Sequence, residues 1–148
     1  SADFGMMVPL FNLVYHDAVV CYWQHGQPFG REDHVNHVLH DLLSAQPSSW
    51  SFIYEQWEDL KPLIGQCAQL LGRLHARTAL CEMVSHEFVT PDFQVHRATF
   101  SDGTVVCVNF DLRTRDCDGV RLAPKGFSVC FPGEAPIQGR LSRDILVD

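Results

Sequence analysis

The sequence predicts an α+β fold: the last strand and the helices of a (β/α)8-type barrel, followed by a small antiparallel β-sandwich. Three observations support this prediction: an apolar run near the start, two segments of helical periodicity, and short alternating segments from residue 86 onward. We expect residues 1–84 to form the barrel-like part and residues 85–148 the sandwich. A chain of 148 residues that is 46% hydrophobic and 20% charged can bury a core of its own.

The first apolar run covers residues 8–20, which read VPLFNLVYHDAVV. Its apolar residues occupy both alternations, which is typical of a strand buried on both faces of a sheet. Such a strand needs neighbours on both sides, yet no second strand of this type precedes the antiparallel segments. We therefore expect the other barrel strands upstream of this chain. We also expect residues 8–20 to associate with that missing barrel or with a second copy of the chain.

Two helices are expected in the middle of the chain. Residues 32–46 place Val35, Val38 and Leu42 at helical spacing, and Pro47 follows them. A second helical region starts near Ser51. Because proline lacks an amide proton, we expect Pro62 to break or kink this region, so that the longest helix covers residues 62–83.

The last third of the chain predicts an antiparallel β unit. Turn-forming residues separate short alternating segments at residues 87–90, 94–100, 104–110, 119–122 and 127–131. Asp102-Gly103 between two of these segments predicts a tight hairpin turn, because glycine adopts the positive φ that such turns require.

Charge and composition exclude several classes of partner. The net charge is −7 and the 11 basic residues form no run, so we expect no nucleic-acid partner. No stretch reaches the roughly 18 to 20 apolar residues of a membrane span, so we expect no membrane contact. The six cysteines form no CxxC motif and are expected to be reduced core residues. Unpaired cysteines and the lack of a signal peptide in this piece favour the cytoplasm.

Four phrases of the sequence resemble a known family: VPLFNLVYHDAVV, LHDLLSAQPSSW, SHEFVTPDFQVHRATFSDGTVVCVNFD and LAPKGFSVCF. They are similar to the C-terminal part of large (β/α)8-barrel glycoside hydrolases, of the endo-α-N-acetylgalactosaminidase-like group and related uncharacterised glycosidases. The resemblance covers most of residues 8–131. It implies a glycoside hydrolase as the parent protein and a carbohydrate as its ligand.

Glycoside hydrolysis ordinarily needs two carboxyl groups, which a barrel places at the ends of several different strands. One such strand end is expected here, at His16-Asp17. We predict that His16, Asp17 and Trp23 contact sugar in the intact parent, with Trp23 stacking on a pyranose ring. The alternatives are that Asp17 caps a loop, that His16 is a buried hydrogen-bonded residue and that Trp23 anchors a loop. No catalytic residue is assigned, because the catalytic carboxylates are expected upstream, and the isolated chain is predicted to be inactive.

Other titratable residues are given structural roles. His34, His37 and Asp41 lie at i, i+3 and i+7, and we expect them on a solvated helix face rather than around a metal ion. His86 and Glu87 are adjacent in a predicted strand and therefore point to opposite faces. No motif indicates a metal or another cofactor, so none is expected. The alternative to the enzyme fragment is a non-catalytic α+β module that binds a protein or a glycan.

Overall fold

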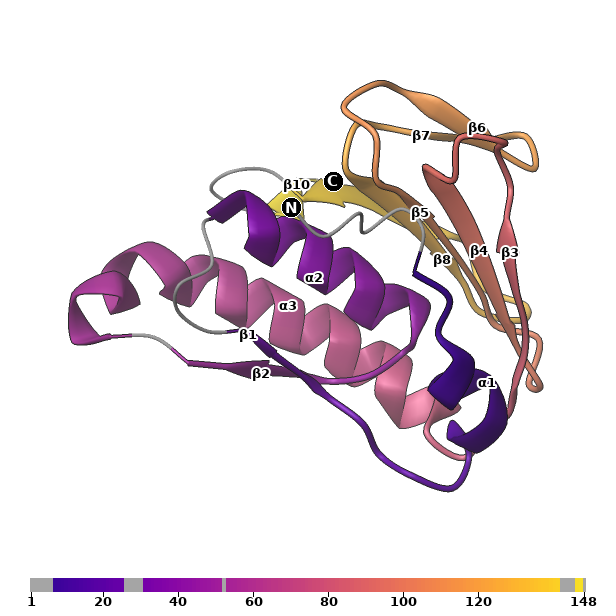
Figure 1. Cartoon of the computed structure of the whole chain (residues 1–148), viewed down its shortest axis with the longest axis horizontal. Coiled ribbons are helices and arrows are strands. Elements are labelled where there is room, and N and C mark those ends of the chain that lie inside the picture. Colours follow the sequence, from indigo (N-terminus) through magenta and orange to yellow (C-terminus); the bar gives the residue numbers. More distant parts are fainter. Residues whose placement is uncertain (1–6, 26–30, 52, 142–145, 148) are drawn as a thin grey trace.

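An antiparallel sheet and two long helices that lie against one of its faces form the main part of the described structure (Figure 1). The computed structural model describes residues 7–25, 31–51, 53–141 and 146–147. Within these ranges the sheet has six strands in the order β10-β9-β8-β5-β4-β3. Their bounds are Met83–Phe88 (β3), Val95–Phe100 (β4), Val105–Asn109 (β5), Gly126–Cys130 (β8), Ile137–Leu141 (β9) and Leu146–Val147 (β10). The predicted mixture of helices with an antiparallel β unit is confirmed.

The turn between β4 and β5 is the predicted one. Gly103 has φ +91°, and its amide donates to the Phe100 carbonyl over 2.9 Å. The Asp102 carboxylate accepts hydrogen bonds from the Thr104 amide at 2.8 Å and from the Thr104 hydroxyl at 2.9 Å. These local bonds set the register in which Thr99 faces Val105 across the hairpin.

A small ribbon lies on the other side of the sheet, away from the long helices (Figure 1). It consists of β6 (Arg115–Cys117) paired antiparallel with β7 (Val120–Leu122). Its apolar side chains pack on the outer face of the sheet in a cluster formed by Val95, Cys107, Cys117 and Leu122. The strands β6 and β9 were not expected from the sequence. β6 reads RDC and β9 reads IQGRL, and neither carries a strong apolar alternation.

The two long helices are α2 (Arg31–Leu43) and α3 (Trp57–Thr78), with a short 3-10 turn at Tyr54–Gln56 before α3. The expected break at Pro62 is wrong, because Pro62 lies inside α3. Pro62 removes one helical hydrogen bond, the one to the Glu58 carbonyl near the start of α3. Glu58 is exposed, so water can bind this carbonyl instead.

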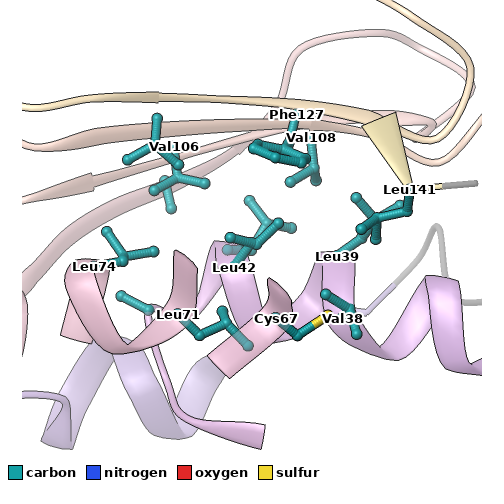
Figure 2. Packing of buried hydrophobic residues seen from close by; sticks show 14 of the residues in the cluster. Val38, Leu39, Leu42, Cys67, Leu71, Leu74, Val106, Val108, Phe127 and Leu141 are labelled. Atoms are coloured by element: carbon teal, nitrogen blue, oxygen red, sulfur yellow. The ribbon is translucent and has the colours of Figure 1, made fainter. Parts of the chain in front are cut away.

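One hydrophobic core joins both helices to the sheet (Figure 2). Helix α2 contributes Val38, Leu39 and Leu42, helix α3 contributes Cys67, Leu71 and Leu74, and the sheet contributes Val106, Val108, Phe127 and Leu141. Five apolar residues of the segments predicted as strands at 94–100, 104–110 and 127–131 are all buried: Phe100, Val106, Val108, Phe110 and Phe127. The sheet and both long helices therefore share a core and stabilise one another.

The first apolar run is not a strand, and this prediction is wrong. Leu10–Tyr15 forms a short helix, α1, in which the Leu13 and His16 amides donate to the carbonyls of Pro9 and Asn12. A central strand needs backbone partners on both sides, and the described chain offers none there. A helix satisfies its own backbone groups instead.

After α1, the chain forms strand β1 (Trp23–His25), which pairs in parallel with β2 (Ser48–Trp50). This two-stranded sheet is separate from the large one. In the described ranges we find no helix that is both long and apolar enough to span a bilayer.

Candidate functional site

A hollow of about 370 Å3 lies where α1 meets the start of β3. Its lining carries one imidazole and two carboxyl groups among apolar side chains: Leu13, Val14, His16, Asp17, Glu82, Met83 and Val84. Carboxylates accept hydrogen bonds, and clustered acceptors beside apolar surface suit a polyhydroxylated ligand.

His16 holds this end of α1 in place. Its ring is buried, with Nδ1 2.7 Å from the Cys81 carbonyl oxygen and Nε2 2.9 Å from the Ser44 carbonyl oxygen. The ring also packs on Phe100 at 4.9 Å between centroids. Because both ring nitrogens face backbone carbonyls, His16 connects α1 to the turn after α3 and to the end of α2. This environment matches the alternative given for His16, a buried and hydrogen-bonded residue.

Asp17 follows His16 directly and is exposed at the hollow. Glu82 also lines the hollow and is fixed through its backbone. The Glu82 amide donates to the Ser101 hydroxyl at 3.1 Å, and its carbonyl accepts from the Ser101 amide at 2.9 Å. Sequence reasoning missed Glu82. No motif connects it to Asp17, and only the packing of α1 against β3 brings both into one lining.

Trp23 is the first residue of β1 and lies in register with Ser48 of β2. The residues that line the hollow come from α1, from the two residues after it, and from the chain just before and within β3. The structure therefore brings His16 and Asp17 together there and places the backbone of Trp23 in a different element.

The expected solvated face of α2 is wrong. His34, His37, His40 and Asp41 are all buried. Two neighbours cover them: Trp50 of β2 packs on His34 at 5.5 Å between ring centroids, and Phe110 at the end of β5 packs on His40 at 4.6 Å.

Asp41 has a structural role at the end of α2. Its Oδ1 accepts a hydrogen bond from Gln46 Nε2 at 2.9 Å, and its Oδ2 accepts one from the Ser48 hydroxyl. These bonds hold the chain as it leaves the helix and enters β2.

The strand histidines lie on the helix-facing side of the sheet. His86 Nε2 lies 3.0 Å from His96 Nδ1, whereas Glu87 points to the other face and pairs with Arg97 at 2.5 Å. This is the alternation that the sequence predicted. Burial, and then the neighbouring His96, lower the pKa of His86 to about 4, while Glu87 acts in the opposite direction. Among the described residues, no group of three or more His, Cys, Asp and Glu side chains suits a metal ion.

Comparison with known proteins finds similarity between this chain and part of one enzyme. No protein-family model and no curated protein matches the chain. Among solved structures, the quadruple mutant of the alpha-N-acetylgalactosaminidase NagBb from Bifidobacterium bifidum is 34% identical, with a TM-score of 0.54 over 70% of this chain. The GalNAc complex of NagBb is 33% identical, with a TM-score of 0.54 over 71% of this chain.

The chain is similar to one region of a glycoside hydrolase. It spans 16% of the first of these NagBb structures and 17% of the second. This similarity agrees with the resemblance seen in the sequence and supports a relationship to carbohydrate-active enzymes.

Proposed function

We propose that this chain is the C-terminal part of a glycoside hydrolase that acts on α-linked N-acetylgalactosamine. In this proposal residues 1–84 belong to the end of its barrel domain, and residues 85–148 form a sandwich part that packs against their helices through the shared core. The observation that carries the proposal is the similarity to NagBb, 34% identity across 70% of this chain but across 16% of the enzyme.

The surface of residues 8–22 supports a covering partner of this kind. Large apolar side chains stand exposed along this segment, which we call the N-terminal apolar face: Val8, Leu10, Phe11, Val14, Tyr15, Val19, Val20 and Tyr22. Exposed apolar side chains gathered on one short segment are typical of a surface covered by another domain or chain. In the proposal, the rest of the barrel covers this face.

The hollow beside α1 supplies sugar contacts in this proposal. Asp17 and Glu82 accept hydrogen bonds from sugar hydroxyls, and His16 positions Asp17 because both of its ring nitrogens lie beside backbone carbonyls. The predicted stacking of Trp23 on a pyranose ring concerns a side chain that lies outside the described residues. The two catalytic carboxylates come from other barrel strands, so the chain by itself hydrolyses no glycoside.

Two assays test the proposal. The isolated chain, given a panel of aryl α- and β-glycosides that includes the α-N-acetylgalactosaminide, should show no turnover. The intact parent encoded by the same open reading frame should hydrolyse the α-N-acetylgalactosaminide. Turnover by the isolated chain that Asp17→Asn abolishes would make Asp17 catalytic, and an open reading frame without a barrel would overturn the proposal.

In the parent, Asp17→Asn should raise KM several-fold and leave kcat nearly unchanged, because a neutral amide accepts weaker hydrogen bonds from sugar hydroxyls. Asp59→Asn, on the exposed side of α3, is the matched control and should change neither value. A large loss of kcat in Asp17→Asn alone would assign Asp17 to the chemical step instead.

A further inference from the structure

The sulfur atoms of Cys107 and Cys117 lie 2.7 Å apart on the outer face of the sheet. Cys107 belongs to β5 and Cys117 ends β6, and both side chains are buried in the small cluster beneath the ribbon. Carbon atoms in contact ordinarily keep about 3.5–4.0 Å, and sulfur is larger. The two sulfur atoms are therefore closer than ordinary van der Waals contact, although no disulfide joins them.

Ion pairs hold the ribbon so that the sulfurs stay together. Arg97 of β4 bridges Asp118 in the turn after β6 and Glu87 of β3. At the other end of β6, Arg115 pairs with Asp111 and Asp92. These contacts join the ribbon to the sheet independently of the cysteines. Closing a bond between the two sulfurs therefore costs little additional conformational entropy.

The charges around the pair differentiate the two thiols. The hydrogen bond between the two sulfurs lowers the pKa of Cys117, and the Arg97 guanidinium also lowers it, against the opposing effect of burial. The same hydrogen bond and burial raise the pKa of Cys107. Cys117 is thus the more acidic thiol of the pair and Cys107 the less acidic one.

We propose that Cys107 and Cys117 form a redox-active dithiol that a hydroperoxide oxidises to a disulfide, tying β6 to β5. The Cys117 thiolate attacks one oxygen of hydrogen peroxide, which breaks the O–O bond and yields a sulfenic acid and hydroxide. The Cys107 sulfur then displaces the sulfenic hydroxyl. The proton of Cys107 and the proton that Cys117 released earlier convert both hydroxides to water. Two thiols and one peroxide give one disulfide and two waters.

Cys130 is a built-in control. It lies on β8 in register with Val105 of the neighbouring strand β5, and its sulfur lies 4.0 Å from the Phe131 carbonyl oxygen. Trypsin separates the three cysteines onto peptides 98–113, 116–121 and 126–140. Each possible pairing therefore has its own cross-linked peptide.

The test treats the chain with hydrogen peroxide, alkylates the remaining thiols in denaturant and counts them by mass spectrometry. We expect four alkylated thiols instead of six, a cross-link between peptides 98–113 and 116–121, and recovery of all six thiols after reduction. Cys130→Ser should keep this cross-link. Six remaining thiols, over-oxidation without a cross-link, or a cross-link through Cys130 would overturn the proposal.

A second measurement tests the roles of the two thiols. Cys107→Ser removes the resolving sulfur, so Cys117 should accumulate as a sulfenic acid that dimedone labels. Cys117→Ser should leave Cys107 unlabelled under the same conditions. The reverse labelling would contradict the assignment of Cys117 as the nucleophile.

Discussion

His86 Nε2 and His96 Nδ1 share a hydrogen bond of 3.0 Å between the adjacent strands β3 and β4. His96 Nε2 lies 2.9 Å from the Phe93 carbonyl, an acceptor, so this nitrogen carries a proton. His96 Nδ1 then accepts, and His86 Nε2 donates. The pair is complete when both rings are neutral, and a proton on His96 Nδ1 would break it.

This pair predicts a loss of stability in mild acid. The pKa of His86 falls to about 4 in the folded state, chiefly through burial and then through His96, whereas an unfolded histidine titrates near 6.5. Between these values the unfolded chain binds more protons, so the free energy of unfolding decreases as pH falls from about 7 to 4. Because the ring is partly exposed and screened by solvent, we expect the contribution of His86 to be ~1 kcal/mol.

Urea unfolding at several pH values, compared with His86→Gln, measures this contribution. Glutamine can still donate to His96 but does not titrate, so the variant should lose part of the pH dependence. His75→Gln is the control, since His75 contacts the Ala45 carbonyl at 3.1 Å and lies outside this pair. Equal pH dependence in the wild type and His86→Gln would refute the prediction.

Two glycines should respond to alanine in opposite directions. A Cβ on Gly126 would lie 2.7 Å from the Ala123 carbonyl oxygen and 3.1 Å from the Gly139 oxygen, and both are backbone atoms. Gly126→Ala should therefore destabilise the protein by about 1–3 kcal/mol. In α3, a Cβ on Gly72 meets nothing within 4 Å, so Gly72→Ala should stabilise by up to about 1 kcal/mol. Thermal unfolding of the two variants distinguishes them, and equal shifts would contradict the close backbone packing around Gly126 at the start of β8.

Removal of the Asp41 carboxylate should cost about 2–3 kcal/mol, because it would leave buried polar partners unsatisfied. Asp41→Ala removes the acceptor for Gln46 and Ser48 at the end of α2. Ser48→Ala removes one of these bonds and should cost less, about 1 kcal/mol. Chemical denaturation checks both values. If Asp41→Ala leaves the free energy of unfolding unchanged, the chain between α2 and β2 holds its conformation without this side chain.

The N-terminal apolar face should cause the isolated chain to associate. Val14 is 64% exposed in the middle of this face, and burial of such surface contributes roughly 25 cal/mol per Å2. Sedimentation over a hundredfold concentration range should show self-association that Val14→Lys weakens by at least tenfold. Leu112→Lys is the control, because Leu112 is 68% exposed but lies outside the face.

A strictly monomeric chain that Val14→Lys does not alter would contradict this prediction. It would favour the alternative of a non-catalytic module with no covering domain, since nothing would then need to pack on residues 8–22.

The sequence determined the parts of the fold that depend on local chemistry. Asp102-Gly103 sets its own turn through the Asp102 carboxylate and the positive φ of Gly103. The alternation of β4 and β5 places Phe100, Val106 and Val108 on the buried face. The phrases around these strands also carry the resemblance to glycoside hydrolases that comparison with NagBb supports.

Only the tertiary structure decided the conformation and burial of the other segments, because these depend on which neighbours pack against them. The apolar run at residues 8–20 is compatible with a central strand, but without flanking strands its backbone satisfies itself in α1. The helical spacing of the polar residues in α2 predicts a solvated face. In the structure, Trp50 of β2 covers His34 and Phe110 after β5 covers His40. Asp17 and Glu82 line one hollow because α1 packs against β3, which lies far along the chain. Cys107 and Cys117 come together because the ribbon folds back onto the sheet, which no local pattern encodes.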